Sequence, residues 1–141
     1  MKKNFEMVFE ANSIELSNIT YNIEQNIPED YNGDINIECK DDYKIKEISE
    51  DGFLVEVSRH VFLNPKYIFD LVVSYLIVFT IGDETKVAYK GKYDELKSEI
   101  ENQIVNLIDS TTVLSRASAL ISSITTHVRL NPIITPPKMD L

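Results

Sequence analysis

The segment from residue 67 to residue 81 constrains the possible folds of this chain most strongly. Its odd-numbered positions are all aliphatic or aromatic, whereas its even-numbered positions include Asp70, Ser74 and Thr80. Alternation with a period of two is typical of a β-strand, and one wholly apolar face beside one mixed face predicts a central strand with a half-covered outer face. The segment also contains a charged residue and is too short to cross a bilayer as a helix.

Alternating apolar residues predict an earlier strand between residues 5 and 23. The apolar positions change from even to odd numbers after Leu16. Such a change within one extended strand requires a bulge or a bend, which we place near Ser17 and Asn18. Residues 26–34 contain a proline and a glycine and therefore predict a loop.

The segments on either side of the central strand are also predicted to be extended. Residues 35–39 form a short alternating segment, and the polar residues 40–44 separate it from residues 53–63. The odd positions of that second segment lie on one face and are apolar except for Arg59. After the central strand, the motif GDET predicts a tight hairpin turn that returns the chain antiparallel through KVAYKGKY.

Two helices are predicted in the last third of the chain. Residues 93–108 repeat apolar side chains at helical spacing, and Asp109 or Ser110 can cap a second helix. Arg116 is the only charged residue between Thr111 and Thr126. A helix that faces solvent usually carries more charge, so we expect this one to pack against another subunit of a homo-oligomer. The candidate contact residues are Val113, Ala117, Leu120, Ile121 and Ile124.

Chain length and charge set further limits. Strands followed by helices indicate an α+β fold, and 141 residues predict a single domain that spans residues 1–141. A formal net charge of −9 argues against nucleic acid and against direct binding to anionic membranes. Cys39 is the only cysteine, and acidic residues interrupt the N-terminal apolar residues, so neither a disulfide nor a signal peptide is predicted. We therefore expect a soluble, cytoplasmic protein.

The residues that usually perform catalysis form no recognisable motif in this sequence. His60, His127 and Cys39 are far apart and lack metal-ligand spacing, which favours ordinary structural roles for all three. The acids of residues 27–42 lack the ligand spacing of an EF-hand loop, and a solvated loop is the better interpretation. No Gly-rich phosphate loop or nucleophile elbow is present. The sequence predicts no enzyme activity, no cofactor and no metal site.

What stands out instead is apolar surface. It comprises the even-numbered face of the central strand, the uncharged second helix and the tail LNPIITPP near the C-terminus. One interpretation places all three in the core or in an oligomer interface. The other is a groove for extended apolar peptide, and the two are compatible because subunits can build a groove together.

Three blocks of the sequence resemble the SecB family of bacterial export chaperones. The early block FEANSIELSNITYNI and the late block RASALISSITTHVRLNPIITPPKMDL are similar to the first strand, long helix and proline-flanked apolar passage of that family. Between them, FDLVVSYLIVFTIGDE is similar to the long third strand and its Gly-acid turn. These blocks occur in the family's order and span most of the chain.

The resemblance implies a four-stranded antiparallel sheet with helices packed on one face, assembled as dimers or tetramers. It also implies an ATP-independent chaperone, or holdase, that binds extended apolar segments of unfolded client proteins in protein export, or that serves one dedicated partner such as an antitoxin. The alternative is a non-catalytic oligomeric adaptor that reuses the fold without holding clients. The candidate groove residues are Phe62, Leu63, Leu130, Ile133 and Ile134.

Departures from the family pattern affect the export role more than the fold. SecB proteins carry acidic residues on the early strand that help to dock the translocase motor, and the corresponding residues here are Asn18 and Asn22. The chain ends soon after its double proline, without the further helix and tail of many SecB proteins. An acidic and basic helix also replaces the family's Gly-rich connection. We therefore expect weak docking, or none, to an export motor.

Overall fold

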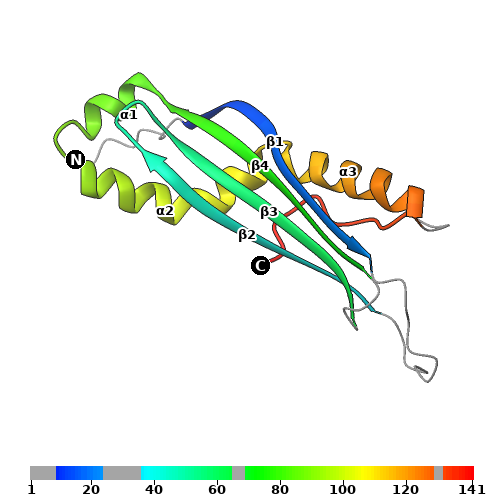
Figure 1. Cartoon of the computed structure of the whole chain (residues 1–141). Coiled ribbons are helices and arrows are strands. Elements are labelled where there is room, and N and C mark those ends of the chain that lie inside the picture. Colours follow the sequence, from blue (N-terminus) through cyan, green and yellow to red (C-terminus); the bar gives the residue numbers. More distant parts are fainter. Residues whose placement is uncertain (1–8, 24–35, 65–68, 129–131) are drawn as a thin grey trace.

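The fold is described by a computed structural model that covers residues 9–23, 36–64, 69–128 and 132–141 (Figure 1). The sheet contains four antiparallel strands in the order β1-β4-β3-β2. The helices lie on one of its faces. This arrangement confirms the α+β class and the four-stranded sheet. The elements are β1 (Phe9–Ile23), β2 (Asn36–Ile48), β3 (Gly52–Asn64), β4 (Phe69–Ile81), α1 (Asp83–Ala88), α2 (Tyr93–Ser110) and α3 (Val113–Val128).

Strand β4 occupies a central position, as its two-sided pattern predicts. Its odd-numbered side chains from Leu71 to Ile81 are all buried on the face toward the helices, which we call the inner face. On the outer face Val72 and Leu76 are half-buried, and Val78 is exposed. The prediction of one covered and one half-covered face is therefore confirmed.

Strand β1 contains the predicted irregularity. Its register against β4 shifts between Leu16 and Asn18, and a second shift between Ala11 and Ser13 was not predicted. The Ser17 hydroxyl at the first of these shifts donates to the carbonyl oxygen of Ser74 at 3.0 Å. The bulge places both Leu16 and Ile19 on the inner face although their positions differ in parity.

Strand β2 is longer than predicted, because it continues through the polar residues 40–44. From Cys39 to Ile45 its odd-numbered residues pair with inner-face residues of β3, and the even-numbered Lys40, Asp42 and Lys44 lie on the outer face. A register shift between Ile45 and Glu47 reverses this parity at the end of the strand. The outer face is solvated, so charged side chains are compatible with an extended strand there. A break in hydrophobicity was therefore a poor signal for a break in the strand.

The segment after β4 also differs from the prediction. Residues 83–88 form helix α1 and not the return strand of a hairpin. Gly82 has an extended conformation, and Asp83 and Glu84 lie in the first turn, where carboxylates stabilise the positive end of the helix dipole. These acidic residues favour a helix start at a position where the sequence pattern suggested a turn.

Helices α2 and α3 close the core against the sheet. Helix α2 follows the predicted bounds closely and buries one of its faces. At the start of α3, the hydrogen bond to the helix comes neither from Asp109 nor from Ser110, the two predicted caps. The Thr111 hydroxyl oxygen accepts from the amide of Val113 at 3.3 Å. In the described residues no single helix has the length and hydropathy of a membrane span; α2 and α3 meet these criteria only as a pair bent by 52°. Their buried residues include Leu96, Ile100, Ile104, Ile108, Val113, Leu114, Ala117 and Ile121.

Candidate functional site

A buried ion pair joins β2 and β3 on the inner face of the sheet. Arg59 on β3 and Asp41 on β2 are direct neighbours on the inner face, and their side chains are 1% and 0% exposed. Arg59 Nε donates to Asp41 Oδ1 and Arg59 Nη2 donates to Asp41 Oδ2, both at 2.7 Å. Burial disfavours the charged guanidinium, but the hydrogen bonds and charge of Asp41 outweigh it and raise the pKa of Arg59.

The remaining donors of this guanidinium mainly bind the C-terminal tail, residues 132–141, and Nη1 also donates to the Ser118 hydroxyl on α3 at 3.0 Å. Arg59 Nη2 donates to the carbonyl oxygen of Lys138 at 2.8 Å. Arg59 Nη1 donates to the Thr135 hydroxyl at 3.0 Å and also to the carbonyl oxygen of Pro136. One buried arginine therefore connects the sheet to three successive parts of an extended segment.

Asp41 and the two long helices hold the same tail from other sides. Asp41 accepts from the amide of Asp140 through Oδ2 at 2.7 Å and donates its own amide to the Asp140 carbonyl oxygen at 2.6 Å. The Thr125 hydroxyl accepts from the amide of Ile133 at 2.8 Å. Asp109, predicted as a helix cap, instead accepts from the amide of Met139 at 2.9 Å. The tail is thus an ordered part of the molecule (Figure 1).

The structure does not gather the five candidate groove residues into one groove. Ile133 is 2% exposed in the inner core, whereas Ile134 is 77% exposed. Phe62 lies on the opposite, outer face of the sheet, with its ring 4.6 Å from that of His60. The side chain of Leu63 and the whole of Leu130 lie outside the described residues.

The candidate subunit contacts fall into two groups. Val113, Ala117 and Ile121 are buried against the core of their own chain, so their apolar character does not require a second subunit. Leu120 and Ile124 are half-buried at the border of that core and keep part of their apolar surface available. The uncharged side of α3 is therefore explained largely by packing within the chain.

The inner face of the sheet is wider than the layer that covers it. Along both edge strands, some inner-face side chains remain exposed, and on β1 they are exposed although their neighbours on β4 are buried. On β1, Leu16 is 46% exposed and Ile19 is 44% exposed. On β2, Ile37 is 48% exposed. These margins are apolar surface beside an ordered tail, which is a suitable arrangement for contacts with another polypeptide.

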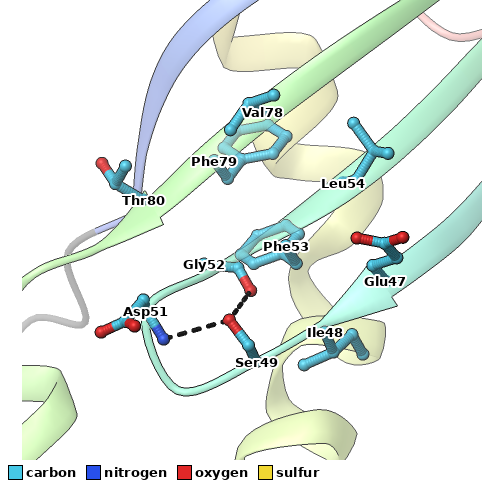
Figure 2. Close-up of a pocket in the computed structure, with 10 residues that line it drawn as sticks. All are labelled: Glu47, Ile48, Ser49, Asp51, Gly52, Phe53, Leu54, Val78, Phe79 and Thr80. Carbon is cyan, nitrogen blue, oxygen red and sulfur yellow. Dashed lines mark hydrogen bonds between the residues drawn. The ribbon is translucent and has the colours of Figure 1, made fainter.

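The outer face carries a hollow of about 630 Å³ at the β2–β3 hairpin (Figure 2). Leu54 and Val78 supply apolar side chains, and Glu47 and Asp51 supply acidic ones. At Gly52 the backbone of β3 approaches the carbonyl oxygen of Phe79 so closely that a Cβ atom would overlap it. The hollow has the composition to receive an apolar side chain with a basic neighbour.

Titratable groups show no assembled catalytic arrangement in the part of the chain that the structure describes. Burial raises the pKa of Cys39 to about 11; Arg59 opposes the shift, and Asp41 and Asp140 add to it. The thiol is therefore a poor nucleophile at neutral pH. His60 pairs with Asp70 on the outer face, and no group of three or more potential metal ligands was found among these residues.

Sequence reasoning missed the role of Arg59, although a signal was present. A lone arginine among apolar residues on one face of a strand predicts either an error of register or a buried charge with a partner. Because a buried guanidinium requires several acceptors, that position pointed to an acid on a neighbouring strand. The partner, Asp41, was hidden in the polar segment that we expected to separate two strands.

Comparison with known proteins shows a shared fold. No family model matches the chain, and no curated protein matches it in sequence. Among solved structures, it is similar to the Mycobacterium tuberculosis Rv1957 SecB-like chaperone, solved in complex with a ChAD peptide from the Rv1956 HigA1 antitoxin. The TM-score is 0.52 at 12% identity, over 91% of this chain and 89% of that chain. The fold expected from the resemblance to SecB is confirmed.

Proposed function

We propose that this protein is a non-catalytic, ATP-independent chaperone that binds extended apolar segments of other polypeptides. The observation that carries the proposal is the uncovered inner face along both edge strands, at Leu16, Ile19 and Ile37. A monomeric core of this kind gains stability by covering such side chains. Their exposure supports a role in contacts between chains.

The energetics favour a client that makes several weak contacts. Each large apolar side chain that becomes fully buried contributes about 1.5–3 kcal/mol. Ordering an extended client costs part of that gain, so a single contact is insufficient and several must act together. A net charge of −9 keeps the exposed apolar surface soluble and attracts basic segments.

The client is either any unfolded chain or one dedicated partner. The similar Rv1957 protein was solved with a peptide from an antitoxin, and this supports the dedicated partner as the second candidate. We further propose that the protein acts in the cytoplasm. Asn18 and Asn22 lie on the outer face of β1 and are neutral and exposed. The lack of acidic side chains at these positions supports the expectation that the protein docks weakly, or not at all, to an export motor.

We also propose that the protein forms a homo-oligomer through β1. Leu16 and Ile19 supply exposed apolar side chains, and Leu120 and Ile124 supply the partly exposed border of α3. Arg116 Nη1 donates to the carbonyl oxygen of Ile14 at 3.3 Å, so the start of α3 lies beside this strand. Within the described residues β1 is an edge strand, and its exposed side chains together with the border of α3 are the surface that we propose for this contact.

The experiment that tests client binding follows the light scattering of denatured model proteins on dilution, with and without the folded protein. It is done in chelator and without nucleotide. We expect a stoichiometric amount of protein to slow aggregation of several unrelated clients. An unchanged rate for every client would exclude general holding and favour the dedicated partner. Absence of binding to both clients and candidate partners would favour the adaptor alternative.

A further inference from the structure

The contacts that hold the tail are directed mainly at its backbone. Three tail amides donate to side-chain oxygens of the body, and two tail carbonyl oxygens accept from Arg59. The Ser118 hydroxyl donates to a third carbonyl oxygen, that of Thr135, at 3.0 Å. Backbone groups are the same in every polypeptide, so this set of contacts can hold an extended segment of almost any sequence.

Only a few tail side chains are buried against the rest of the protein. Ile133 is 2% exposed and Thr135 is 6% exposed, whereas Ile134 between them is 77% exposed. This alternation is that of an extended strand with one face bound. The body therefore selects an aliphatic side chain and, two residues later, a small hydroxyl-bearing one.

We propose that the tail occupies, within its own chain, a binding slot for extended polypeptide. A client segment with an aliphatic residue two positions before a threonine or serine takes this slot when the tail leaves it. The slot is defined by Arg59, Asp41, Asp109, Ser118 and Thr125. The inference rests on the proposed function and names the place on the protein where the client binds.

The chemistry of the slot permits exchange. Arg59 and Asp41 remain paired with each other when the tail leaves, so a vacant slot contains no unpaired buried charge. The tethered tail is present at a high effective concentration, and Pro136 and Pro137 lower the entropy lost on extending it. A client therefore competes with the tail, and weak binding of short peptides to the intact protein is expected.

The test uses the full chain and a fluorescent peptide with the sequence of residues 132–141. Ile133→Asp weakens the tail and leaves every residue of the slot unchanged. Ile134→Asp adds the same charge at the exposed neighbouring position and serves as the matched control. By fluorescence anisotropy, we expect the peptide to bind Ile133→Asp about tenfold or more tightly than it binds the wild type. The control should match the wild type, and equal affinity for all three folded proteins would overturn the proposal.

A second measurement uses the wild type and covers the case in which Ile133→Asp does not fold. Hydrogen exchange at the amides of Ile133, Met139 and Asp140 is compared with and without a saturating unfolded client. We expect the client to accelerate exchange at these amides as the tail leaves. If a client binds and leaves the exchange of these amides unchanged, the proposal that it takes the slot of the tail is wrong, whereas the proposed chaperone function still holds. Peptide binding to Ile133→Asp without any holding of clients would support the slot and count against the chaperone role.

Discussion

The two edge strands of the sheet, β1 and β2, differ in how their free edges are protected. The inner side of β2 at Asp41 is joined to the C-terminal tail by backbone and side-chain hydrogen bonds, and its outer face carries three lysines. Strand β1 contains no lysine, arginine or proline. It has two register shifts, and Leu16 and Ile19 are exposed.

This difference indicates separate roles for the two edges. Proteins usually protect an edge strand with charge, bulges or a covering segment, because an unprotected edge pairs with other chains. Strand β2 is protected by its lysines and by the tail of its own chain. Strand β1 has its bulges and the acidic residues Glu10 and Glu15, but within the described residues no further strand pairs with its free edge. Its exposed apolar side chains therefore make it the edge for the proposed contact with another subunit.

The largest expected effect on the free energy of unfolding comes from removing the anchor of the tail on β2. Asp41→Ala leaves the guanidinium of Arg59 buried without its carboxylate and removes the anchor of the tail at Asp140. We expect a loss of about 3–5 kcal/mol in the free energy of unfolding. Urea denaturation followed by circular dichroism measures it.

The control for this variant is Glu56→Ala. Glu56 pairs with Lys46 at 3.3 Å, but both side chains are partly exposed. Removing that pair should change the free energy of unfolding by only about 0.2–1 kcal/mol. Similar losses for the two variants would contradict the distinction between a buried anchor and a solvated surface pair.

A second test uses Cys39, which lies on β2 two residues before Asp41. Its pKa is raised from 9.0 to about 11, so at pH 8 the folded protein should contain about 100-fold less thiolate than an ordinary cysteine. Alkylation with iodoacetamide should be slower by that factor. The rate should keep rising tenfold for each pH unit beyond pH 9, because the group is still largely protonated there.

The same reaction reports on the tail. Asp41→Ala should accelerate alkylation of Cys39, because release of the tail hydrates the thiol and removes the main cause of its raised pKa. A folded wild-type protein that reacts as fast as a free cysteine would show that this part of β2 is not covered. The urea-unfolded protein supplies the reference rate.

The hairpin that joins β2 to β3 should tolerate little change. Gly52→Ala places a methyl group against the carbonyl oxygen of Phe79 on β4, and the two strands must then separate locally. We expect destabilisation of about 1–3 kcal/mol by thermal or urea unfolding. Gly91→Asn is a useful comparison, since Gly91 has a φ of 75° and open space around its Cβ position, and Asn tolerates that conformation. Equal tolerance at both glycines would contradict the close approach at Gly52.

The smallest effect on protomer stability is expected at the open edge. Leu16→Lys combined with Ile19→Lys places two charges on exposed positions and should change the free energy of unfolding of the protomer by about 0.5 kcal/mol or less. It should nevertheless reduce the sedimentation coefficient by preventing association. Ile37→Lys makes a similar change on β2 and should leave association intact. A wild type that sediments as a monomer, or an oligomer that survives both changes, would contradict the role of β1.

Periodicity in the sequence predicted most of the sheet, because alternation is a local property. It located β4 and its two faces, and it placed the bulge of β1 at Ser17. It failed for helix α1, where acidic residues at a helix start resembled a turn, and for the centre of β2, where polar residues face solvent on a regular strand. The first error came from reading GDET as a turn motif. The second arose because hydrophobic patterns report burial and not backbone conformation.

The candidate site was harder to predict, because it depends on residues that are distant in the sequence. Arg59 contacts Asp41 and the tail at Lys138, and no local pattern reports such pairs. The sequence singled out the tail only as apolar surface, whereas in the structure a buried ion pair anchors it together with apolar packing. Ile133 and Phe62 were both candidates for the groove that the resemblance implies, although they lie on opposite faces of the sheet.

We propose that the folded protein binds extended apolar polypeptide without nucleotide or metal. The most direct measurement is a fluorescence anisotropy titration of a labelled, permanently unfolded model client with the wild-type protein in chelator. Circular dichroism of the same samples checks that the protein stays folded. We expect saturable binding that persists in chelator and without nucleotide. A flat titration with a fully folded protein, for several clients of different sequence, would contradict it.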